Sequence, residues 1–94
     1  MVRIEIIADQ AVEDDIREAL REYKAAKHFT KIPVVYGEGN TEPKYGDHIW
    51  PEENFIIIVY CEDDEAARVK AAIAKVKEHF PQEGIKLFEM RDQS

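Results

Sequence analysis

The sequence has one cysteine, one tryptophan, four glycines and four prolines among its 94 residues. A single cysteine cannot form a disulfide within the chain, so nothing indicates an oxidising compartment. No apolar stretch approaches the roughly 20 residues of a membrane-spanning helix. The N-terminus also lacks the basic segment and long apolar core of a secretion signal. We therefore expect a cytoplasmic protein without direct membrane insertion.

Positive charge is also scarce. Thirteen Lys and Arg residues face 20 Asp and Glu residues, which gives a net charge of −7. Nucleic-acid binding needs a clustered excess of cations, so we expect no nucleic-acid partner. The length predicts a single domain over residues 1–94.

Hydrophobic periodicity predicts four strands and two helices. The first helix is expected from Ala11, with Lys24 and Lys27 near its end. The second is expected to be capped by Asp63 or Asp64 and to stop at Pro81. The predicted strands cover residues 2–8, 29–36, 55–61 and 85–90.

This βαββαβ order is the split arrangement of ferredoxin-like domains. It predicts an α+β fold in which a four-stranded antiparallel sheet carries two helices on one face. Pro33 cannot donate to a strand ladder, so its strand is expected to lie at an edge or to contain a bulge.

The strand 55–61 is apolar on both faces. Phe55, Ile57, Val59 and Cys61 alternate with Ile56, Ile58 and Tyr60. The helices can cover only one face, so Ile56, Ile58 and Tyr60 would stay exposed to water. Each exposed side chain would forgo about 1.5–3 kcal/mol of stabilisation from burial. We interpret the open face as a contact with other subunits of a homo-oligomer.

A long irregular segment, GEGNTEPKYGDHIWPEEN at 37–54, separates the second and third predicted strands. The segment contains a Gly-x-Gly at Gly37 and Gly39, and Trp50-Pro-Glu-Glu-Asn directly before the third strand. With the element order, these motifs resemble the PII signal-transduction superfamily, and within it a branch of small PII-like proteins with a short loop. The resemblance covers nearly the whole chain.

The resemblance implies a homotrimer whose open sheet faces meet at the threefold axis. It also implies a non-enzymatic regulatory protein, similar to nitrogen regulatory proteins, with a protruding T-loop that docks on a partner. By analogy with the family, the partner is expected to be a membrane transporter or an enzyme. A small effector would bind in clefts between subunits at the base of that loop. The expected ligand-binding residues are Gly37, Gly39, Lys86 and Arg91, and the expected partner contacts are Tyr45, His48, Ile49 and Trp50.

The sequence departs from the family's nucleotide-binding members. These use a glycine- and lysine-containing loop after the second helix and a basic C-terminal segment, whereas here Gly84, Lys86 and Arg91 are the residues available. A triphosphate needs several donors and cations. The sequence therefore does not identify the effector or any cofactor. The effector could be a ligand smaller than ATP, or the protein could bind none.

Two other protein classes remain as alternatives. One is a metal-ion binding or tolerance protein resembling the CutA-type trimers, for which Asp47 and His48 are the best ligands, without a recognisable metal motif. The other is an amino-acid-sensing module like the ACT domains. No catalytic triad signature is present in the sequence, so we expect no enzyme.

Overall fold

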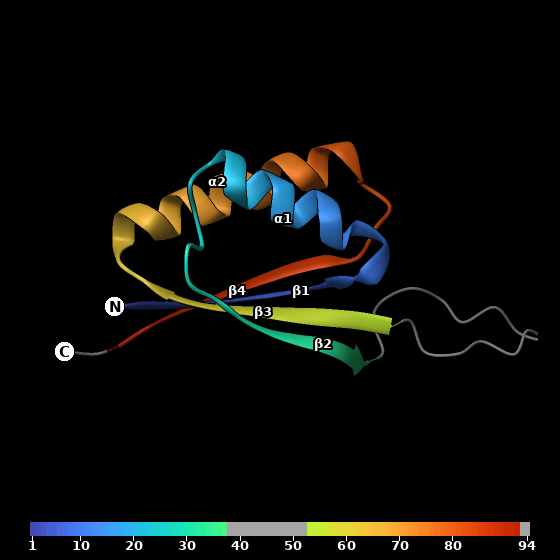
Figure 1. Ribbon diagram of the computed structural model, residues 1–94, viewed down its shortest axis with the longest axis horizontal. Coiled ribbons are helices and arrows are strands. Elements are labelled where there is room, and N and C mark those ends of the chain that lie inside the picture. The colour runs from blue at the N-terminus through green and yellow to red at the C-terminus, as the bar shows by residue number, and fades with distance from the viewer. Residues whose placement is uncertain (38–52, 93–94) are drawn as a thin grey trace, which may run out of the picture.

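Four strands form one antiparallel sheet, and two helices lie together on one of its faces (Figure 1). The structure is a computed structural model that describes residues 1–37 and 53–92. The sheet has the strand order β2-β3-β1-β4, so β2 and β4 are its edges. The ferredoxin-like α+β prediction is confirmed. The elements are β1 (Val2–Asp9), a 3-10 turn η1 (Gln10–Val12), α1 (Glu13–Glu22), β2 (Thr30–Tyr36), β3 (Glu53–Cys61), α2 (Asp63–His79) and β4 (Ile85–Arg91).

The core lies between the helices and the two central strands. In β1 and β3 every second residue is buried, and the buried residues pair across the ladder, as Ile4 does with Val59 and Ile6 with Ile57. Among the described residues, Phe55 is the largest side chain that is fully buried. The helices add the residues that face this layer: Ile16, Ala19 and Leu20 from α1, and Ala66, Val69, Ala72, Ile73 and Val76 from α2.

The first helix begins and ends differently from the prediction. Asp9 accepts a hydrogen bond of 2.8 Å from the backbone amide of Ala11, and this contact starts the 3-10 turn η1 before the α-helix begins at Glu13. The helix ends at Glu22, because Lys24 adopts a left-handed backbone with φ of 53°. Lys24 and Lys27 therefore follow α1 and do not belong to its last turn.

The second helix also starts without the predicted cap. Glu62 is the N-cap residue and makes no side-chain capping bond, so neither Asp63 nor Asp64 caps the helix. Both lie in the first turn instead, where their charges suit the positive end of the helix dipole.

Strand β2 has both features expected from Pro33. It is an edge strand, and its register with β3 shifts between Ile32 and Val35. The Gln10 side chain donates a hydrogen bond of 2.9 Å to the Pro33 carbonyl, which ties this irregular part to η1. Within the described ranges, neither helix combines the length and the apolar character that crossing a membrane requires.

Candidate functional site: the open sheet face and its edges

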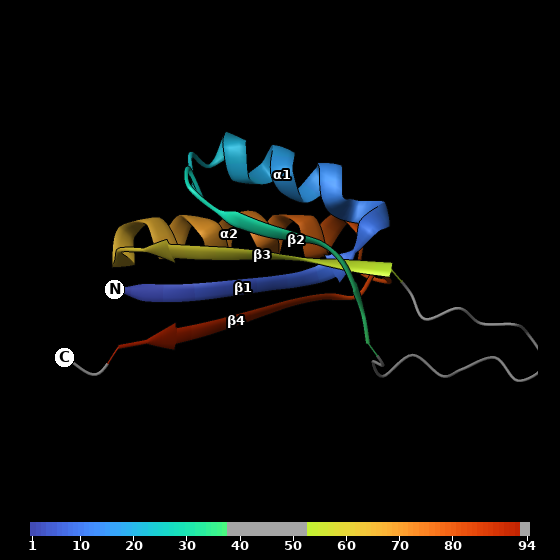
Figure 2. The same cartoon turned by 60° about the horizontal axis from the view of Figure 1, so that its bottom comes forward.

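Among the described residues, no helix or strand covers the sheet face opposite the helices (Figure 2). The exposed and half-buried side chains on this face are largely apolar. Ile56 and Ile58 are half-buried on it, and Tyr60 is 57% exposed, whereas Phe55, Ile57, Val59 and Cys61 are buried beneath the helices. The two faces predicted for this strand are thus confirmed.

Strand β4 extends the apolar surface toward the sheet edge. Phe88 pairs with Glu5 and Met90 with Arg3, and both side chains are about half exposed, at 50% and 48%. With Ile56, Ile58 and Tyr60 of β3 they make an apolar surface on both sides of Arg3 and Glu5 of β1, and we call this surface the open face. Large exposed apolar surfaces rimmed by polar residues mark protein contact sites.

A small polar cluster interrupts the open face. The guanidinium of Arg3 donates 2.8 Å to the Tyr60 hydroxyl and 2.7 Å to a Glu5 carboxylate oxygen. The hydrogen bond to Glu5 is the main cause that raises the pKa of Arg3. The Arg3 Nε is buried and has no partner within the part of the chain that the structure describes.

The predicted ligand residues Gly37 and Lys86 lie on opposite edges of the sheet. Gly37 follows β2, while Lys86 is an exposed residue of β4 that pairs with Ile7. Both are near the same end of the sheet. The end of β2 lies beside the start of β3, and Ala8 near the end of β1 pairs with Ile85 at the start of β4. Three strand spacings separate the two edges, roughly 14 Å. One chain alone does not bring these residues together.

The space around Gly37 does not itself demand glycine. A Cβ added there would meet no atom within 4 Å, and its φ lies outside the left-handed range. Among the described residues, nothing requires glycine at this position.

Arg91, the third predicted ligand residue, lies at the other end of β4. It lies five positions after Lys86, roughly 17 Å along a strand. It pairs with Val2, on the face that carries the helices, and its guanidinium donates to Asp63 and, at 2.9 Å, to Glu89. The bond from Arg91 lowers the pKa of Asp63, and a bond from Lys70 lowers the pKa of Glu89.

The remaining predicted residues fall outside the described ranges. These are Gly39 of the ligand set, Tyr45, His48, Ile49 and Trp50 of the partner set, and Asp47 of the weak metal pair. Residues 1–37 and 53–92 contain no group of three or more His, Cys, Asp and Glu side chains placed to hold a metal ion. Cys61 is buried in β3, and its burial, with nearby carboxylates, raises the pKa of the thiol.

Two surface clefts were not predicted, and they differ in charge. One of about 420 Å³ lies between α1 and α2 and includes the carboxylates of Asp15, Glu18 and Glu22. The other, of about 430 Å³, lies at the end of α1 and contains Arg17, Arg21, Lys24 and Lys27 with no acidic residue in its lining. We call the second the basic cleft. Helical spacing brings only Arg17 and Arg21 together, because Lys24 and Lys27 follow the end of α1.

Comparisons with known proteins agree with the geometry. The family model described as "Nitrogen regulatory protein P-II" matches residues 1–90. No curated protein matches the chain in sequence.

Solved structures share the fold at low sequence identity. A putative PII-like signaling protein from Thermus thermophilus is 19% identical, with a TM-score of 0.65, over 95% of this chain and 83% of that one. CPII from Thiomonas intermedia K12, described as bound to ADP and bicarbonate, is 17% identical, with a TM-score of 0.69, over 95% of this chain and 82% of that one. Another structure of CPII, described as bound to ADP, AMP and bicarbonate, is 17% identical, with a TM-score of 0.67, over 95% of this chain and 86% of that one.

Proposed function

Because this chain belongs to the nitrogen regulatory protein P-II family, whose model matches it over residues 1–90, we propose that it is a PII-like regulatory protein that acts by binding rather than by catalysis. In this proposal it forms a homotrimer through the open face and binds a small effector in the clefts between subunits. It contacts a partner protein through residues 37–54.

One observation carries the cleft assignment. Gly37 and Lys86 are at the same end of the sheet but on opposite edges. When copies associate through their open faces, the β2 edge of one subunit approaches the β4 edge of the next. A site that uses both residues is then shared by two subunits, and the trimer is required for binding.

Lys86 supplies the cation of this cleft, and Gly37 and Gly39 supply backbone that a ligand can approach closely. Arg91 is the other predicted anion partner, and it reaches a ligand only by giving up its bonds to Asp63 and Glu89. Adenine nucleotides and bicarbonate, which similar proteins are described as binding, are the first effectors to test.

Isothermal titration of the purified protein with ADP, AMP and bicarbonate, separately and together, tests the cleft. We expect Lys86→Gln to weaken nucleotide binding about tenfold, as is typical for loss of one charged hydrogen bond. Lys77→Gln, an equal change of charge at an exposed position of α2, serves as the control and should bind normally. Equal affinities for both variants, or no binding of any of these ligands, would contradict this effector assignment.

The partner assignment is tested at Trp50. If Trp50 contacts a partner, Trp50→Ala leaves the thermal unfolding midpoint of the isolated protein nearly unchanged. A decrease of several degrees would mean that Trp50 packs on the body of its own protein, and the partner role would be wrong.

A further inference from the structure

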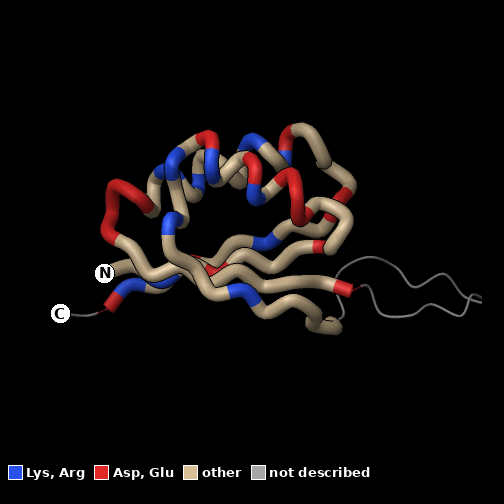
Figure 3. The backbone as a smooth tube through the Cα atoms, in the orientation of Figure 1, with Lys and Arg blue, Asp and Glu red and all other residues tan. Residues whose placement is uncertain are grey.

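The basic cleft opposes the overall charge of the protein. The chain carries −7, yet this cleft gathers four of its 13 Lys and Arg residues. Figure 3 shows that Lys and Arg positions occur along the backbone at the end of α1 and in its connection to β2. A local excess of cations on an acidic protein attracts anions to that position, and the acidic cleft between α1 and α2 repels them.

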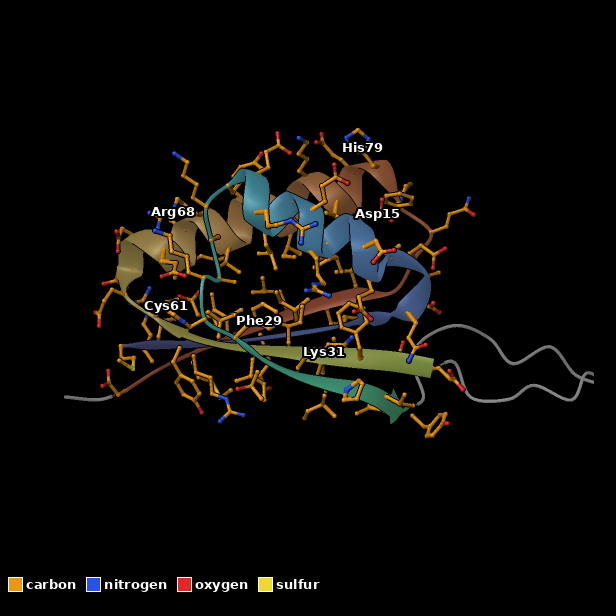
Figure 4. All side chains as sticks on the ribbon, in the orientation of Figure 1. Asp15, Phe29, Lys31, Cys61, Arg68 and His79 are labelled. Carbon is orange, nitrogen blue, oxygen red and sulfur yellow. The ribbon has the colours of Figure 1, made fainter. Side chains whose placement is uncertain are left out.

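Apolar side chains form the floor of the basic cleft. Leu20, Phe29 and Ile57 line it, and Figure 4 shows Phe29 on the side of the sheet that carries the helices. The Arg17 guanidinium lies 5.8 Å from the centre of the Phe29 ring. The volume of the cleft, about 430 Å³, lies within the range of small-molecule sites.

Most of the cations have no acidic partner. Arg17 is 3.9 Å from Glu13, whose carboxylate also accepts a bond of 2.5 Å from Lys31. In residues 1–37 and 53–92 no carboxylate lies within ion-pair distance of the side chains of Arg21, Lys24 or Lys27. Their donors are therefore available to a bound anion.

The backbone gives a second, independent reason to assign a function to Lys24. The amide of Ala25 donates 2.9 Å to the Leu20 carbonyl and the amide of Lys24 donates 3.1 Å to the Arg21 carbonyl, which is the Schellman ending of a helix. The left-handed position of that motif is usually glycine, but here it is Lys24, with φ of 53°. Ala26 has the same unfavourable φ. Such backbone strain concentrates at ligand sites.

We propose that the basic cleft binds a small organic anion, with its phosphate or carboxylate group on Arg21, Lys24 and Lys27 and its aromatic or aliphatic part on Leu20 and Phe29. The site lies within one subunit. Its residues differ from those of the effector cleft, since Phe29 precedes β2 and Gly37 follows it, roughly 25 Å away along the strand of the same chain.

Phenyl phosphate is the probe, with inorganic phosphate and phenol as its two halves. Titration followed by NMR of the ¹⁵N-labelled protein should show saturable shifts of amides in residues 17–29 for phenyl phosphate, with affinity about tenfold above that for either half. Shifts located instead at Gly37 and Lys86, or equal affinities for phenyl phosphate and inorganic phosphate, would overturn the proposal.

Paired variants separate this site from general charge effects. Lys24→Gln with Lys27→Gln should weaken phenyl phosphate binding about a hundredfold, by removing two charged donors. Lys75→Gln with Lys77→Gln removes the same charge from α2 and should leave it unchanged. Lys86→Gln should also leave the affinity for phenyl phosphate unchanged, so a failure of the effector cleft can be told from a failure of this site. The basic cleft would be contradicted if the two double variants lost the same affinity for phenyl phosphate. It would also be contradicted if only Lys86→Gln lost affinity.

Discussion

Arg3 and Tyr60 are directly opposite each other on β1 and β3, and the Arg3 guanidinium donates a 2.8 Å hydrogen bond to the Tyr60 hydroxyl. The same guanidinium lies 5.5 Å from the centre of the Tyr60 ring. A partner subunit that covers the open face therefore meets an ordered polar cluster inside an apolar surface. Such a cluster favours one alignment of the subunits over others, because a misaligned partner would bury it without new bonds.

The first prediction concerns the apolar part of this face. Phe88 is half exposed in one chain, so Phe88→Asp has little to disrupt there. In the proposed trimer the same change would bury a carboxylate in the subunit contact, which is strongly unfavourable. Light scattering should show loss of the trimer mass, whereas Ala71→Asp on the exposed side of α2 should keep it. An unchanged mass for Phe88→Asp would place the subunit contact elsewhere.

The second prediction concerns the strained end of α1. Glycine adopts a positive φ without the steric penalty of a Cβ, which is about 1–2 kcal/mol for other residues. Lys24→Gly should therefore raise the free energy of unfolding by about 1 kcal/mol, measured by urea denaturation. Lys27→Gly is the matched control, because φ at Lys27 is not positive. This substitution should lower the free energy of unfolding, because glycine makes the unfolded chain more flexible. A less stable Lys24→Gly protein would show that the lysine side chain stabilises the fold.

The third prediction concerns the ion pairs at the start of α2. The hydrogen bond from Arg91 lowers the pKa of Asp63 below its usual range. The charged form is favoured by folding, so this contribution to stability is present above the ordinary pKa and is lost as pH falls through the lowered value. In Arg91→Gln the pKa of Asp63, followed by carboxyl NMR titration, should return toward its ordinary value. If it did not move, another group would be responsible for the shift.

The fourth prediction concerns Cys61. Burial raises the pKa of its thiol, and the carboxylate of Glu65 adds to the effect. Alkylation by iodoacetamide at pH 8 should be much slower in the folded protein than in urea, because little thiolate forms and access is blocked. Folding disfavours the thiolate, so stability should decline as pH rises above the ordinary thiol pKa. Rapid alkylation of the folded protein would contradict the buried position.

Much of the fold follows from periodicity alone. The alternation in β3 predicted which side chains are buried, because a strand places successive residues on opposite faces. Pro33 predicted either an edge strand or a bulge, because it has no amide to donate, and β2 has both features. The start of α1 was harder to predict, since Asp9 serves equally well as a cap for a 3-10 turn or for an α-helix.

The candidate site was less accessible from the sequence. Gly37 and Lys86 are separated by the width of the sheet, so their relation depends on a second chain. Arg91 was predicted to bind a ligand, but in the structure Asp63 and Glu89 already accept hydrogen bonds from its guanidinium. The sequence did not indicate these two partners. The basic cleft needs the turn at Lys24 and Ala26 to bring Lys27 and Phe29 beside α1, and nothing in the local sequence indicates positive φ at either residue.

The central claim is that copies of this chain cover the open face of one another's sheets. Size-exclusion chromatography with multi-angle light scattering at micromolar concentration tests it most directly. The account predicts a mass three times that of the 10.9 kDa chain. A mass equal to one chain, with circular dichroism showing that the protein is folded, would contradict it.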